Sequence, residues 1–119
     1  MLWSNRDQPD KAIAEFDQAL RLDPADAMIL AYRGSVWADK GDSAKALTDL
    51  NAAIRLDPRE FLCYWLRAAV WFDDGNYDKA IADYDKAIEL NPKSAEVYHN
   101  RGLAFHAKKE YDKAIADYD

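Results

Sequence analysis

Residues 77–85 read Tyr-Asp-Lys-Ala-Ile-Ala-Asp-Tyr-Asp, and the same nine residues recur at 111–119, 34 positions later. The period extends beyond this segment, because Pro24, Pro58 and Pro92 are also 34 residues apart and each follows Leu-Asp or Leu-Asn. Self-similarity at a fixed period of this length is typical of repeat architectures. The 119 residues divided by 34 give 3.5 periods, so the chain is a short array of repeats.

Each period has the pattern of two helices. In the first, residues such as Tyr64, Ala68 and Trp71 recur at spacings of three and four, which places them on one helical face. The second helix, expected over 78–90, ends before Asn-Pro because proline disfavours helix in the residue that precedes it. A glycine and a capping side chain separate the two helices in successive periods: Gly41 with Asp42, and Gly75 with Asn76.

The repeat resembles the tetratricopeptide repeat (TPR) family over essentially the whole chain. The resemblance rests on a small-residue series, an aromatic series and two alanine series: Gly34, Ala68 and Gly102; Trp37, Trp71 and Phe105; Ala12, Ala46, Ala80 and Ala114; Ala19, Ala53 and Ala87. It implies an all-α, right-handed superhelical solenoid of antiparallel helix pairs, with a concave groove lined by the first helices. Asp7 and Lys109 stand where the family has its turn glycine, so we expect less tight turns there.

The period also predicts the domain organisation. We expect a single solenoid domain over 1–119, with a partial repeat at 1–26, full repeats at 27–60 and 61–94, and a partial repeat at 95–119. By the period, the sequence starts inside a first helix and stops inside a second helix with no polar capping helix after Asp119, so we expect either a fragment of a longer array or open apolar surface at the ends. An alternative to ligand binding is therefore self-assembly, in which the uncapped ends stack head to tail.

Composition excludes several classes of protein. The net charge of -6 argues against a binder of nucleic-acid backbones, and the lone Cys63 cannot form an internal disulfide. No apolar run approaches the roughly 20 residues of a membrane span, and the first residues lack a signal-peptide pattern. We expect a cytoplasmic protein with no membrane span and no nucleic-acid partner.

The family resemblance implies a protein-interaction scaffold rather than an enzyme. The sequence has no Gly-rich phosphate loop and no Ser-His-Asp constellation. His99 and His106 share a helical face, but two histidines without a third ligand make a poor metal site, and Cys63 is on another helix. We therefore expect no catalytic residue, no metal and no cofactor, and a protein or peptide partner.

The residues in register with the family's groove are the candidate partner-binding site. They are apolar or aromatic in the middle of the chain and polar towards the last repeat: Met28, Tyr32, Ser35, Leu62, Trp65, Leu66, Ala69, Phe72, His99, Asn100, Leu103 and His106. Trp65 lies outside the repeating Trp series, and aromatic anchors of this kind are common interface hot spots. The alternative is ordinary packing, with Trp65 partly covered by its neighbours.

One TPR subclass grips a chaperone's C-terminal carboxylate with a clamp of Lys, Asn and Arg. The corresponding places here are Ala31 and Ser35, then Leu66, then Glu96 and Asn100. Only Asn100 fits this pattern. Because the clamp depends on charge-assisted hydrogen bonds from cations, the sequence predicts that this stretch does not bind chaperone tails.

An Arg/Asp series repeats with the same period. Each Arg stands where many TPR proteins have Leu, and an Asp follows 16 residues later on the facing helix: Arg33 with Asp49, Arg67 with Asp83, and Arg101 with Asp117. A half-buried Arg needs a partner. We expect structural ion pairs within each repeat, with pairing to the Arg of an adjacent repeat as the alternative.

Overall fold

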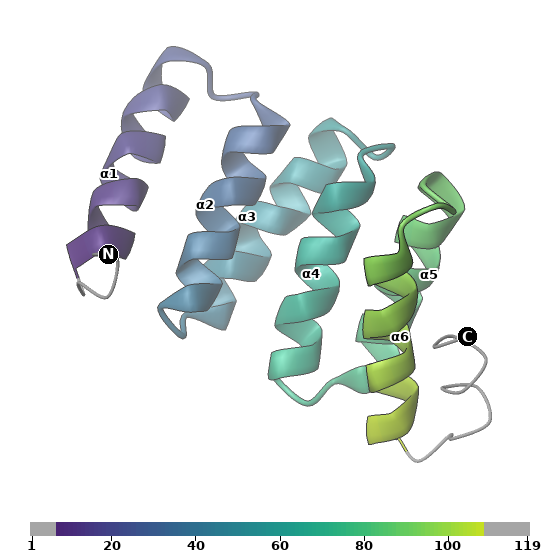
Figure 1. Cartoon of the computed structure of the whole chain (residues 1–119). Helices are drawn as coiled ribbons and strands as arrows, with labels where there is room; N and C mark the ends of the chain where they lie inside the picture. Colours follow the sequence, from purple (N-terminus) through teal and green to yellow (C-terminus); the bar gives the residue numbers. More distant parts are fainter. Residues whose placement is uncertain (1–6, 109–119) are drawn as a thin grey trace. The chain divides into compact units, whose positions relative to one another are not determined.

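The computed structural model describes residues 7–108, which form six α-helices (Figure 1). Their bounds are α1 Asp7–Leu22, α2 Ala27–Asp39, α3 Ser43–Leu56, α4 Phe61–Asp73, α5 Tyr77–Leu90 and α6 Ala95–Ala107. The chain divides into two compact units, unit 1 over 1–58 and unit 2 over 59–119. The all-α class is confirmed. Unit 1 holds α1 to α3, and unit 2 holds α4 to α6.

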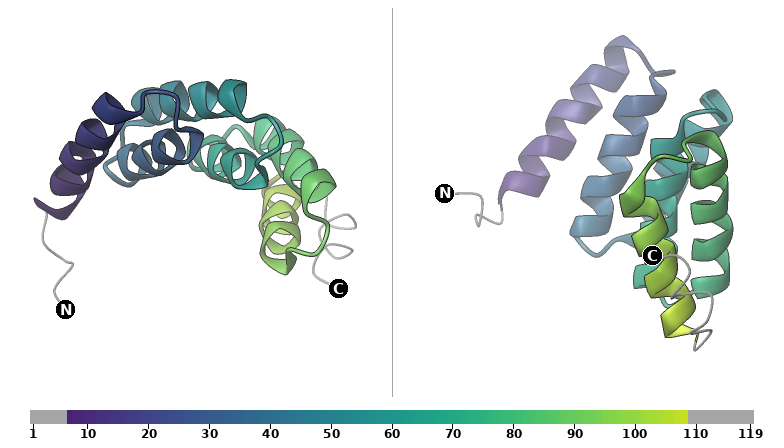
Figure 2. Two further views of the ribbon diagram at one scale, coloured as in Figure 1. Left: turned by 90° about the horizontal axis from the view of Figure 1, so that it is seen from above. Right: turned by 45° about the vertical axis from the view of Figure 1, so that its right-hand side comes forward.

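Within each unit, two consecutive helices form an antiparallel pair, α2 with α3 and α4 with α5 (Figure 2). Gly41 and Gly75 make the turns, with φ of 86° and 80° in the left-handed region that favours glycine. Asp42 and Asn76 then accept a hydrogen bond from the backbone N–H three residues on, at 3.0 and 3.3 Å. The predicted turn and cap residues are confirmed.

The third helix of each unit packs against one member of its pair. In unit 1, α1 packs against α2, and in unit 2, α6 packs against α5. The second helices end at Leu22, Leu56 and Leu90, each followed by the predicted Asp-Pro or Asn-Pro. Asp7 is the first described residue and the first residue of α1, and Lys109 lies outside the described residues, so the less tight turns expected there stay predictions.

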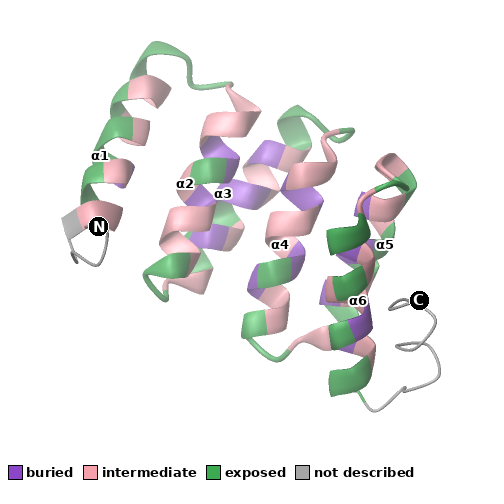
Figure 3. Cartoon of the chain, viewed as in Figure 1, coloured by how far each residue is buried: buried purple, intermediate pink, exposed green. Residues whose placement is uncertain are grey.

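The core of each unit is the layer between its helices, where the buried residues gather (Figure 3). In unit 1, Ala46, Leu50 and Ala53 of α3 are fully buried. A Cβ atom added to Gly34 of α2 would lie 3.1 Å from the carbonyl oxygen of Ala46. The small residues therefore let the backbones of α2 and α3 approach closely.

Candidate functional site

A pocket of about 210 Å³ lies between α4 and α6 of unit 2, with one residue contributed by α5. We call it the α4–α6 pocket. Its lining is half apolar and half polar: Ala69, Phe72, Asp73, Tyr84, Asn100 and Leu103. Four of these residues were predicted to line the groove: Ala69, Phe72, Asn100 and Leu103. The structure thus brings together predicted site residues from two helices that are separate in sequence.

The polar groups of the pocket are Asp73, Tyr84 and Asn100. None of the three side chains forms a hydrogen bond or ion pair with another residue in the described part of the chain. Tyr84 is only 3% exposed, yet no buried side-chain oxygen or nitrogen atom of the described residues lacks a hydrogen-bond partner. Tyr84 thus lines the pocket from an almost fully buried position on α5.

The burial of Tyr84 has an electrostatic consequence. Burial, which disfavours the phenolate, together with the negative charge of Asp73, raises the pKa of Tyr84 to about 12. The hydroxyl is therefore protonated at neutral pH and can both donate and accept a hydrogen bond. The sequence analysis did not include this residue because Tyr84 lies on a second helix, whereas the groove is expected to be lined by the first helices.

Trp65 lies on α4 and is half-buried. Its ring stacks on that of Phe61 one turn earlier, with the ring centroids 6.2 Å apart and an interplanar angle of 16°. Leu62 and Leu66 of the same helix are also half-buried. These three predicted groove residues do not line the α4–α6 pocket. Stacking holds the indole in one orientation while leaving part of it accessible.

In unit 1, the predicted groove residues lie on α2. Met28 and Ser35 are half-buried, and Tyr32 is 45% exposed. The Tyr32 ring stacks on Phe16 of α1, with the centroids 6.4 Å apart. An aromatic side chain on this helix is therefore also held in place while remaining accessible.

His99 and His106 are exposed on α6, and Cys63 is fully buried in α4. In residues 7–108, no group of three or more His, Cys, Asp or Glu side chains could hold a metal ion. No helix in the same range is long and apolar enough to cross a membrane.

A larger hollow of about 390 Å³ lies at the turn between α4 and α5. It is lined mainly by polar residues of the turn itself, and an ion pair between Lys108 and Asp78 lies at its edge. Because apolar anchors are few in this hollow, the α4–α6 pocket is the better candidate.

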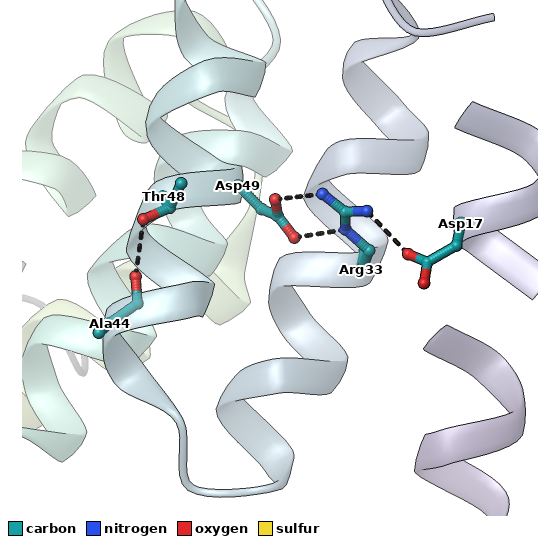
Figure 4. A network of polar contacts seen from close by, with 5 residues as sticks. All are labelled: Asp17, Arg33, Ala44, Thr48 and Asp49. Atoms are coloured by element: carbon teal, nitrogen blue, oxygen red, sulfur yellow. Dashed lines mark hydrogen bonds and ion pairs between the residues drawn. The ribbon is translucent and has the colours of Figure 1, made fainter. Parts of the chain in front are cut away.

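The Arg/Asp series forms a network in unit 1 (Figure 4). Arg33 donates from Nε and Nη2 to the two carboxylate oxygens of Asp49, at 2.8 and 2.7 Å. It also donates from Nη1 to Asp17 of α1, at 2.8 Å. Asp49 is only 5% exposed. One guanidinium therefore joins α2 to α3 and to α1, and these hydrogen bonds, above all that to Asp49, raise the pKa of Arg33.

Unit 2 repeats this arrangement in part. Arg67 donates to both oxygens of Asp83, at 2.7 and 2.8 Å, and these hydrogen bonds raise the pKa of Arg67. Arg101 donates to Asp85 of α5, at 2.7 Å. The third expected partner, Asp117, lies outside the described residues.

The sequence reasoning missed Asp17 and Asp85. Each stands 16 residues before its Arg, on the second helix of the preceding repeat, just as Asp49 and Asp83 stand 16 residues after theirs. A search for acids at both offsets detects this second link. In the alternative expected from the sequence, each Asp of this series pairs with the Arg of an adjacent repeat. The structure differs from that alternative, because one Asp series pairs within its own repeat and a separate Asp series pairs with the Arg of the next repeat.

Comparisons with known proteins agree with this architecture. A family model described as "Tetratricopeptide repeat" matches residues 2–61, and one described as "TPR repeat" matches residues 70–109. No curated protein matches the sequence.

Several solved structures share the fold. A crystal structure of MamA protein is 28% identical with a TM-score of 0.85, and the match covers 92% of this chain and 60% of that one. A second MamA structure is 29% identical with a TM-score of 0.83, covering 92% and 64%. The chain thus spans less than two thirds of the length of these relatives. The first TPR of Spaghetti (RPAP3), bound to the HSP90 peptide SRMEEVD, is 25% identical with a TM-score of 0.76, covering 78% and 74%.

Proposed function

The chain belongs to the tetratricopeptide repeat family, and from this premise we propose that it binds a peptide or helix of a partner protein on the exposed faces of its first helices. The family is generally non-catalytic and its members generally bind proteins. In unit 2, the proposed contact surface is formed by Trp65, Leu66 and the α4–α6 pocket. In unit 1, it is the face of α2 that carries Met28, Tyr32 and Ser35.

The observation that supports this proposal is the accessibility of large apolar side chains on one helix. Trp65 and Phe72 remain half-exposed on α4, although the buried residues of this helix, such as Tyr64 and Val70, already form its contribution to the core. Rigid aromatic side chains next to a pocket are the usual anchors for a partner's apolar groups. A role confined to folding would not require the Trp65 indole at this position.

We further propose that the ligand is not a chaperone tail held by its carboxylate. The TPR of Spaghetti binds an HSP90 peptide that ends in acidic residues. The corresponding places in this chain are Ala31 and Ser35, Leu66, and Glu96 and Asn100, which supply no cation. Glu96 would repel an acidic tail.

The test is selection of ligands from a random peptide library displayed on phage, with the full chain immobilised. We expect the selected peptides to lose about tenfold in affinity for Trp65→Ala, because truncation removes a central anchor. Helicity measured by circular dichroism should be unchanged. Leu56→Ala is the matched control, since Leu56 is a large apolar residue with 47% exposure that lies on α3. Failure to select any ligand, or equal binding by both variants, would contradict the proposal.

Head-to-tail self-assembly is the alternative to peptide binding. Sedimentation equilibrium from low micromolar to near-millimolar concentration distinguishes the two. We expect the mass to remain near the 13.6 kDa of one chain. A mass that rises steadily with concentration would favour assembly.

A further inference from the structure

We propose that the α4–α6 pocket accepts a lysine or arginine side chain of the bound peptide. The inference rests on the proposed function, since it assumes that a peptide lies on this face. It goes beyond that function by specifying the chemical type of one partner side chain, the one that occupies the pocket.

The first argument is the hydrogen-bonding capacity of the pocket. Asp73 supplies a carboxylate and Asn100 supplies an amide oxygen, and Tyr84 lines the same space. These groups form no hydrogen bond or ion pair with other described residues. A carboxylate only accepts hydrogen bonds, whereas ammonium and guanidinium groups only donate them. The pocket therefore matches a cation in both charge and hydrogen-bond direction.

The second argument is the position of Asp73, which is the last residue of α4. The carbonyl groups at the C-terminal end of a helix carry partial negative charge, so a carboxylate there is unfavourable and a cation is favourable. Among the described residues, no Lys, Arg or His side chain lines the pocket to offset this charge. Arg101, which follows Asn100 in sequence, is bound by Asp85. A partner's cation would supply the missing positive charge.

The apolar wall fits the rest of such a side chain. Ala69, Phe72 and Leu103 line the pocket beside the polar groups. The methylene groups of lysine and arginine pack on apolar surface while their charged ends reach polar groups. The ring of Phe72 can also attract a cation placed over its face.

Long-range electrostatics act in the same direction. The chain has 22 acidic and 16 basic residues and a net charge of -6. A field of this sign accelerates the approach of basic segments and disfavours acidic ones. The local and the overall charge therefore both favour a basic peptide.

The experiment continues the phage selection on the full chain. Peptides selected on the native sequence should carry Lys or Arg at one fixed position, and that enrichment should disappear for Asp73→Asn. For one selected peptide, replacing the basic residue by norleucine and replacing Asp73 by Asn should each weaken binding roughly threefold to tenfold, as for a partly screened ion pair. Because both changes remove the same contact, their combination should cost little more than either alone.

Asp74→Asn is the matched control, since it removes the same charge one residue away, outside the lining of the α4–α6 pocket. We expect Asp74→Asn to weaken binding by less than twofold. Added salt should weaken peptide binding less for Asp73→Asn than for the native chain, because the variant has lost the screened ion pair. Selected peptides without a basic residue, or equal effects of Asp73→Asn and Asp74→Asn, would overturn the inference while leaving peptide binding intact. A selection that yields no ligand would instead count against the proposed function.

Discussion

At the scale of single residues, the most consequential side chains are the arginines that occur once in every repeat. Arg67 binds both oxygens of Asp83, a carboxylate that is only 6% exposed. Bidentate Arg–carboxylate contacts combine charge with fixed geometry. A buried carboxylate that loses such a partner is costly, whereas an apolar pair in the same place is often tolerated.

We therefore predict that Arg67→Leu lowers the free energy of unfolding by about 3 kcal/mol, because the Asp83 carboxylate stays buried without its guanidinium. Adding Asp83→Ala should recover most of this loss. Urea unfolding of the single and double variants measures the coupling between the two residues.

The control for this cycle is the exposed pair of Lys86 and Glu89, with 3.5 Å between its charged atoms. Lys86→Ala should change the free energy of unfolding by less than about 0.5 kcal/mol. Equal costs for Arg67→Leu and Lys86→Ala would show that the buried pair has no special role.

The sequence predicted this pairing only in part, for a physical reason. The 16-residue spacing identifies Asp49 and Asp83 as partners because both helices of a pair belong to one repeat. Asp17 and Asp85 act through the contact between one repeat and the next, so a search within single repeats misses them. One guanidinium has five N–H donors, which is enough for both carboxylates.

Tyr84 offers a second prediction at this scale. Its folded-state pKa of about 12 lies above the ordinary tyrosine value of 10.0, so between these values the folded state holds the proton more tightly than the unfolded state. The contribution of Tyr84 to stability is complete below about pH 10 and is lost as the pH rises towards 12.

A titration that follows phenolate absorbance checks this prediction. Tyr84→Phe should remove the phenol whose pKa burial raises and should flatten the loss of stability above about pH 10. Tyr32→Phe is the control, because Tyr32 is 45% exposed. Identical alkaline titrations of the two variants would contradict the assigned pKa.

At the scale of helices, local sequence determines where each element begins and ends. Asn76 caps α5, so this helix starts at Tyr77, one residue before the expected range of 78–90. The Leu-Asn-Pro sequence ends it at Leu90 as predicted. Signals of this kind act within four residues of one another, which is why the sequence predicts helix ends well.

The turn between α4 and α5 gives a prediction at the scale of the element. Gly75 has a φ of 80°, and an added Cβ would meet nothing within 4 Å. Gly75→Ala should therefore lower the free energy of unfolding by about 1 kcal/mol, the cost of left-handed backbone for an L-residue.

Gly75→Asn is the control for this turn, because asparagine adopts the left-handed region more readily. Thermal unfolding should rank the stabilities as Gly, then Asn, then Ala. A loss for Asn equal to that for Ala would point to a cause other than the backbone conformation.

At the scale of the whole molecule, the repeat period was enough to predict the class of fold. It was not enough to predict the pocket, because the pocket is formed only when three helices pack together. The spacing identified Phe72, Asn100 and Leu103 as members of one face. It assigned Tyr84 to the core, because its position is apolar in every period. The burial of Tyr84, with 3% exposed, confirms this assignment, and only the packing of α4, α5 and α6 reveals that this core residue also lines the pocket.

The burial of Cys63 has a practical consequence. It is the chain's single cysteine and has no accessible surface in the folded state. A thiol-alkylating reagent can reach it only when the surrounding structure opens transiently. The rate of alkylation under native conditions therefore reports how often this part of unit 2 opens, so the protein carries its own probe of local dynamics.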